Sequence, residues 1–137
     1  MTSTISHHTA LVYTMVLVSA ADSDMTDSEL FTIGEIARTL PVFKDYDPER
    51  LPKAAEDCAE LLGQEGGLDT VIGLIQDALP EKLRETAYAM ACDVAAADGK
   101  VGQEELKLLQ FLRHQLGVGR LPAAAIERGA RARYMRL

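Results

Sequence analysis

Two short acidic stretches hold the residues of this chain that could do chemistry. The first runs from Ala20 to Leu30 (AADSDMTDSEL) and the second from Ala96 to Leu106 (AADGKVGQEEL). Each places aspartate in a turn-forming sequence and glutamate where a helical pattern begins. Carboxylates that gather in one place repel one another unless a cation lies among them or some stay protonated. The chemistry to consider is therefore the binding of a cation.

The two acidic stretches correspond to each other at an offset of 76 residues. Asp22 aligns with Asp98 and Glu29 with Glu105. The apolar positions around them also agree: Val18, Leu30, Ile33, Ile36 and Leu40 align with Val94, Leu106, Leu109, Leu112 and Leu116. This pattern predicts an internal repeat. If a pseudo-twofold relation brings the two turns together, four or more carboxylates converge.

The first stretch partly imitates an EF-hand loop. Residues from Asp22 to Ser28 supply oxygens at its first four ligand positions, but Asp27 occupies the glycine position and Ile33 the position of the bidentate glutamate. An EF-hand is excluded. Oxygen ligands favour Ca²⁺, Mg²⁺ or Mn²⁺ over Zn²⁺ or Cu²⁺. A second interpretation needs no metal, because turn aspartates bond their own backbone and first-turn glutamates complement the helix dipole.

The helical periodicity predicts an all-α protein of about seven helices. Apolar stripes, caps and prolines place them at about 6–21, 26–40, 48–63, 68–79, 81–97, 103–116 and 122–134. Leu30, Ile33, Ile36, Ala37 and Leu40 are expected to face inward on the second helix, as are Leu106, Leu109, Leu112 and Leu116 on the sixth. We expect one domain over 1–137, with repeats at about 6–63 and 81–134 joined by a linking helix at 68–79.

The charge is unevenly distributed. The net charge is −7, yet residues 120–137 carry +4, which leaves −11 on residues 1–119. An acidic body makes nucleic acid an unsuitable partner. The basic end is amphipathic and could contact anionic lipid or an acidic partner through four arginines, or pack on the domain's own acidic face. These arginines are Arg128, Arg131, Arg133 and Arg136.

Other candidate residues have simpler interpretations. Cys58 and Cys92 match no metal or redox spacing and are expected to be core thiols. His7 and His8 are adjacent on a helix, so they point in different directions and are expected to be solvent-exposed. No nucleophile elbow, metalloprotease motif or phosphate loop is present, and His114 lies too far along its helix from Glu105 to act with it. We therefore do not expect an enzyme.

The apolar run from Thr9 to Ala21 is expected to be a core helix and not a signal segment. No Lys or Arg precedes it, and it has a counterpart in residues 85–97. It is also shorter than a membrane span. The expected location is the cytoplasm.

The order and spacing of these motifs resemble the tellurite-resistance TerB family and the related acidic domain of membrane-bound DnaJ-type co-chaperones. The resemblance rests on Ala-Ala-Asp-Ser-Asp with Ser-Glu-Leu, and on Ala-Ala-Ala-Asp-Gly-Lys-Val with Glu-Glu-Leu, over about residues 8–116. It implies a small, repeated helical domain of stress-response complexes near the membrane, with acidic residues that bind a divalent cation. Carried over to this sequence, those residues are Asp22, Asp24, Glu29, Asp98, Glu104 and Glu105.

Two functional hypotheses follow. In the first, the chain is a non-catalytic stress-response module that binds Ca²⁺, Mg²⁺ or Mn²⁺ at the two acidic turns, with protein partners near the inner membrane and a peripheral membrane contact as an option. In the second, it is a metal-free helical scaffold that binds a basic segment of a partner. Lys100, which stands where the first stretch has Asp24, departs from an all-acidic site. Direct capture of tellurite is not expected, since carboxylates repel an oxyanion.

Overall fold

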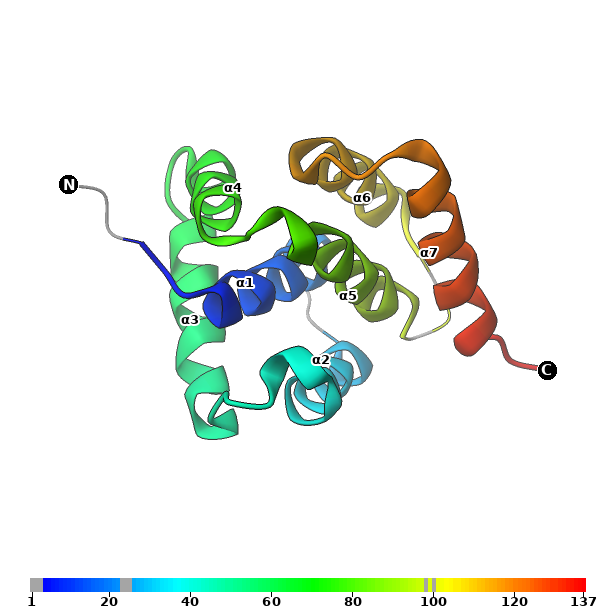
Figure 1. The fold of residues 1–137 in the computed structure, drawn as a ribbon, viewed down its shortest axis with the longest axis horizontal. Helices are drawn as coiled ribbons and strands as arrows, with labels where there is room; N and C mark the ends of the chain where they lie inside the picture. Colours follow the sequence, from blue (N-terminus) through cyan, green and yellow to red (C-terminus); the bar gives the residue numbers. More distant parts are fainter. Residues whose placement is uncertain (1–3, 23–25, 98, 100) are drawn as a thin grey trace.

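The computed structural model describes residues 4–22, 26–97, 99 and 101–137, and over these ranges the regular structure is entirely helical (Figure 1). The prediction of an all-α fold with about seven helices is confirmed. The α-helices are α1 (His7–Ser19), α2 (Asp27–Thr39), α3 (Leu51–Leu62), α4 (Gly67–Ala78), α5 (Arg84–Ala96), α6 (Gln103–Leu116) and α7 (Arg120–Arg133). Short 3₁₀ turns accompany them: η1 (Ala20–Asp22), η2 (Pro41–Phe43), η3 (Pro48–Arg50) and η4 (Glu81–Leu83).

Local sequence signals set the ends of these helices. Ser6 caps α1, its hydroxyl accepting a 3.1 Å hydrogen bond from Thr9 N. Pro41 and Pro80 follow α2 and α4, since proline cannot continue a helix. Gly117, at φ 70°, ends α6 in the left-handed conformation that glycine adopts without strain. The main difference from the prediction is that the starts expected near 48 and 81 are first 3₁₀ turns.

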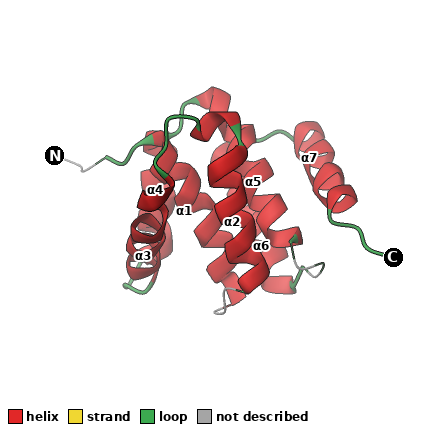
Figure 2. Ribbon diagram, turned by 90° about the horizontal axis from the view of Figure 1, so that it is seen from below, coloured by secondary structure: helices red, strands yellow, loops and turns green. Residues whose placement is uncertain are grey.

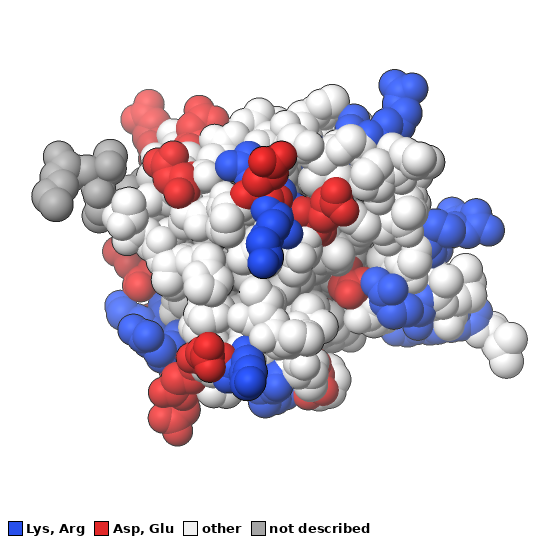
Figure 3. Space-filling view, in the orientation of Figure 1, with Lys and Arg blue, Asp and Glu red and all other residues white. Residues whose placement is uncertain are grey.

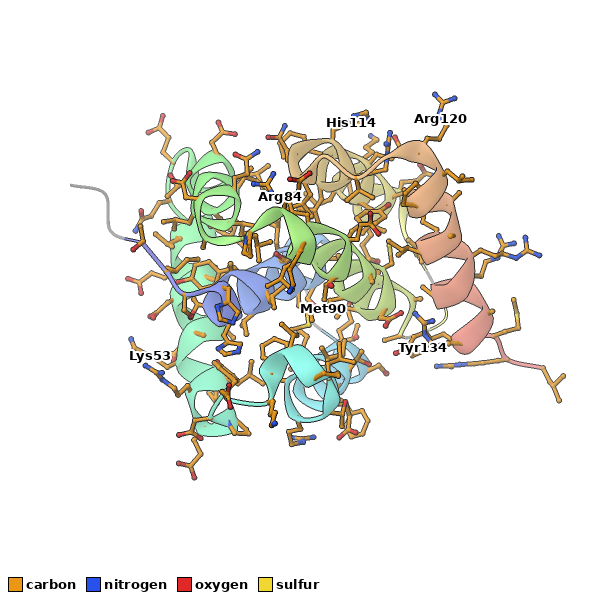
Figure 4. The ribbon with its side chains drawn as sticks, in the orientation of Figure 1. Lys53, Arg84, Met90, His114, Arg120 and Tyr134 are labelled. Carbon is orange, nitrogen blue, oxygen red and sulfur yellow. The ribbon has the colours of Figure 1, made fainter. Side chains whose placement is uncertain are left out.

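Helix α1 forms the centre of the core. Every residue from Ala10 to Ser19 is buried, so this helix has no solvent-facing side over that length. It packs most extensively against α5, and also against α3, α4 and α2. Met90 of α5, near the middle of the view in Figure 4, is 1% exposed. The apolar run that imitates a signal segment is thus an interior helix of the folded domain.

The helices after the two acidic turns pack in a reciprocal way. Helix α2 packs against α5, whereas α6 packs against η1 and α1. Each of these helices therefore contacts the apolar helix of the other predicted unit, as a twofold relation between units would require. The helix starts also agree, since Asp27 and Gln103 are 76 residues apart. The repeat and the division of the chain into units stay a prediction.

The junction between α3 and α4 depends on two glycines. Gly66 has φ 70°, and Gly67 is buried against the end of α3. A Cβ atom at position 67 would lie 2.1 Å from Leu61 O and 2.9 Å from Leu62 Cα. Only glycine allows the two backbones to approach this closely.

Candidate cation site

The two acidic stretches, 20–30 and 96–106, are called the acidic corners below. The first contains a complete capping box at the start of α2. The Thr26 hydroxyl accepts a 3.1 Å hydrogen bond from Glu29 N, and Glu29 Oε1 accepts a 3.0 Å bond from Thr26 N. The Thr26 hydroxyl also donates to the same carboxylate oxygen at 3.1 Å. This is the arrangement predicted from Thr-Asp-Ser-Glu. Glu29 is only 4% exposed, so the cap holds a carboxylate inside the protein surface.

The second corner repeats half of this arrangement at the start of α6. Glu105 Oε1 accepts a 3.4 Å hydrogen bond from Gly102 N. Glycine has no side chain, so the reciprocal bond to the N3 amide cannot form. Glu105 is nevertheless 4% exposed, as Glu29 is. Both helices thus begin with a buried glutamate three residues after the N-cap.

The burial of the two glutamates corrects the predicted inward face of both helices. Leu30 is 48% exposed and Leu106 is 45% exposed, although both were expected to face inward. The buried stripe on α2 instead includes Glu29, Thr32, Ile33, Ile36 and Ala37. On a helix with 3.6 residues per turn, Leu30 lies at the edge of this stripe and Glu29 near its centre. The buried face of each helix is therefore centred on the N3 glutamate, and the leucine that follows it lies at the margin.

The predicted metal ligands are described only in part. Asp24, Asp98 and the side chain of Asp22 lie outside the described residues, as does Lys100. Glu104 is exposed in the first turn of α6. Among the described side chains, no three of His, Cys, Asp or Glu gather in a group that could hold a metal ion. A cation site at this place therefore requires the turn aspartates.

The turn η1 packs on α6. η1 leads out of α1 into the first acidic stretch, and α6 leads away from the second. Figure 2 shows α1, α2, α5 and α6 together in one bundle. Because Glu29 Oε1 accepts both Thr26 bonds and a carboxylate offers about four lone-pair sites, capping does not exhaust its capacity to bind a cation.

The four predicted contact arginines fall into two pairs. Arg133 forms an ion pair with Asp93 of α5, and Arg136 donates a 3.3 Å hydrogen bond to Ala97 O. Arg128 and Arg131 are exposed on α7. Tyr88 of α5 adds a 2.6 Å hydrogen bond from its hydroxyl to Glu127 Oε2. The last helix therefore packs on the domain itself, and Arg133 and Arg136 contact it although all four arginines are exposed.

The thiols are buried as predicted, but one histidine is not exposed. Cys58 and Cys92 are 0% and 5% exposed, and burial raises the pKa of each thiol to about 12. His7 is exposed. His8 is half-buried: its Nε2 lies 2.8 Å from Val42 O, and its ring stacks on Phe43. The turn η2, which sequence reasoning did not anticipate, supplies both of these contacts.

The model of the family described as tellurite resistance protein TerB matches residues 8–128. The chain belongs to the TerB family. The match includes α1 to α6 and the first part of α7, so both acidic corners of this TerB domain lie within it. No curated protein and no solved structure is significantly similar to the chain. In the described part of the TerB domain, no helix is long and apolar enough to cross a lipid bilayer.

Proposed function

We propose that this TerB domain is a non-catalytic module that binds a divalent cation through the carboxylates of its two acidic corners. The reciprocal packing of η1 on α6 and of α2 on α5 is the observation that carries the proposal. This packing supports the proposal because it connects the first acidic stretch with the helix that follows the second, and each stretch contains a glutamate that is 4% exposed. Placing several carboxylates near one another is unfavourable without a counter-ion.

The donor set fits a hard cation. The residues that would hold it are Asp22, Asp24, Glu29, Asp98, Glu104 and Glu105, all of which offer carboxylate oxygen, the ligand that Ca²⁺, Mg²⁺ and Mn²⁺ prefer. The bound cation would neutralise their charge and tie the two corners together. The capping bonds of Glu29 and Glu105 would fix the carboxylates before the cation arrives, which lowers the entropy lost on binding.

The role we propose in the cell is a stress response of the tellurite-resistance type, in the cytoplasm and beside protein partners near the inner membrane. It follows from membership of the TerB family and from the resemblance to co-chaperone domains. The carboxylates would respond to a cation and would not capture tellurite, since an oxyanion is repelled by a negative site.

Calorimetric titration of Ca²⁺ and Mn²⁺ tests the proposal. We expect binding heat with the wild type and none with the double variant Asp22→Asn/Asp98→Asn. The matched control is Asp69→Asn/Asp77→Asn, which removes the same charge from two exposed positions on α4 and should bind as the wild type does. Absence of heat with the wild type would contradict cation binding and leave the second hypothesis, a metal-free scaffold for a basic partner segment.

A second variant separates cation binding from helix capping. Gln at N3 can still form a capping box, so Glu29→Gln keeps the hydrogen bond to Thr26 N and loses the charge. We expect the thermal midpoint without metal to stay within a few degrees of the wild type, while cation affinity falls at least tenfold. Unchanged affinity would assign Glu29 to capping alone.

A further inference from the structure

A groove of about 900 Å³ lies between α6 and α7, with α5 as its floor. Helix α7 packs along α5 but has no contact of similar extent with α6. Figure 2 shows α7 standing apart from the rest of the bundle. Gly99 and Val101, from the middle of the second acidic stretch, also line this groove.

Each of the three helices presents residues at helical spacing to the groove. Helix α5 contributes Tyr88, Cys92, Ala95 and Ala96; helix α6 contributes Leu106, Leu109 and Gln110; and helix α7 contributes Ala124, Glu127, Arg128 and Arg131. The stripe on α5 is already packed against α7 and α6, since Tyr88, Cys92 and Ala95 are 1–5% exposed, so the surface still open lies along the rims of the groove. From Tyr88 to Ala96 the floor extends about 12 Å at 1.5 Å per residue. Anchors at i, i+3 or i+4 and i+7 on a bound helix would span about the same length.

Several apolar side chains that line the groove are exposed to solvent. Val101 is 39% exposed, Leu106 is 45% exposed and Met135 is 67% exposed, and all three line the same groove. A single exposed leucine is ordinary, whereas several exposed apolar residues in one concave site mark a binding surface. The occupant must therefore carry an apolar face.

The charged residues around the groove indicate the charge of the bound partner. Arg128, Arg131 and Arg136 line it, and the blue side chains at the right of Figure 3 lie on this side of the molecule, where Figure 1 places α7. Glu127 also lines it, but its carboxylate accepts the Tyr88 hydrogen bond. A helix with acidic residues beside its apolar face would complement both features.

We propose that this groove binds an acidic amphipathic helix of a partner protein. The bound helix would place aliphatic anchors against Val101, Leu106 and Met135, and its carboxylates beside Arg128 and Arg131. The proposal differs from cation binding in ligand charge and in the charged side chains that bind, which are arginines here and carboxylates there, although Gly99 and Val101 of the second acidic stretch also line the groove.

The test is selection from a displayed library of four-turn helical peptides. Their apolar stripe has leucine at i, i+3 and i+7, and their flanking positions vary among Glu, Gln and Lys. We expect enrichment of Glu-flanked peptides that bind the full chain in EDTA and bind Asp22→Asn/Asp98→Asn equally well. Because the peptides should bind without metal, this result does not depend on whether the acidic corners bind a cation. Enrichment of Lys-flanked peptides, or of none, would overturn the proposal.

Matched variants locate the binding surface. Leu106→Gln and Arg128→Glu/Arg131→Glu should each weaken the selected peptide at least tenfold. Leu121→Gln and Arg120→Glu alter exposed residues of α7 that do not line the groove and should change affinity less than twofold; Arg120 projects away from the molecule in Figure 4. Equal losses in both sets would overturn the assignment. The assignment would also be overturned if phosphatidylglycerol vesicles, and not the peptides, perturbed the backbone amide signals of α6 and α7.

Discussion

The close approach of α3 and α4 predicts opposite effects for the same substitution at two glycines of one helix. In Gly67→Ala, the new Cβ would begin 2.1 Å from Leu61 O, whereas ordinary contacts lie beyond 3.4 Å. The obstacle is backbone, so α3 and α4 must separate by more than 1 Å to relieve the overlap. Overpacking of this kind costs about 1–3 kcal/mol.

Gly73→Ala is the matched control. Gly73 lies in the middle of α4, and a Cβ there meets nothing within 4 Å. Alanine is favoured over glycine inside a helix by about 1 kcal/mol, so this variant should be more stable than the wild type. The two variants should therefore differ by about 2–4 kcal/mol in the free energy of unfolding.

Urea denaturation followed by circular dichroism measures this difference directly. At roughly 3–5 °C per kcal/mol for a chain of this size, the thermal midpoints should also separate by about 6–20 °C. A Gly67→Ala variant as stable as the wild type would refute the steric argument. A Gly73→Ala variant that is less stable would show that the middle of α4 is more crowded than the structure indicates.

Three further predictions concern α7, the thiols and the orientation of α2. Tyr88→Phe should destabilise the protein by roughly 1.5 kcal/mol in urea denaturation, because it removes a hydrogen bond from α5 to a carboxylate on α7; no change would mean that this bond does not hold α7. Cys58 and Cys92 should react with Ellman's reagent at pH 8 only as fast as the protein unfolds. Burial raises the pKa of both thiols to about 12, above the ordinary 9.0, so the stability gained by burying them in the neutral form is complete below pH 9 and is lost as the pH rises toward 12. Rapid reaction with the reagent in the native state would contradict their burial. Ile33→Ala should cost about 2–4 kcal/mol, while Leu30→Ala should cost less than about 1 kcal/mol, and equal losses would restore the inward position first predicted for Leu30.

The helices can be located from the sequence because their ends depend on local chemistry. Thr26 and Glu29 define the start of α2 through bonds within four residues, and Gly117 ends α6 through its own φ angle. Pro41 and Pro80 act on the preceding turn alone. Signals of this kind are complete in the sequence and need no knowledge of the remaining fold.

The orientation of the helices was harder to predict. A stripe of leucine and isoleucine suggested that Leu30 and Leu106 face inward, but the N3 glutamates hold that central position, and both leucines turn to the edge. The groove beside Leu106 could not be predicted either. It depends on α7 packing far more on α5 than on α6, which is a long-range preference that no local motif encodes.

Because α2 packs on α5 and α6 packs on η1, the N-terminal and C-terminal parts of the domain each complete the other's core. A fragment ending at the Gly66-Gly67 junction would contain α1 with its long apolar surface but lack α5, its largest partner. Neither this fragment nor the remaining one could bury its apolar surface alone, whereas the two mixed together should associate and cover it. The domain should consequently fold and unfold in a single concerted step, even though the sequence predicts two repeated units.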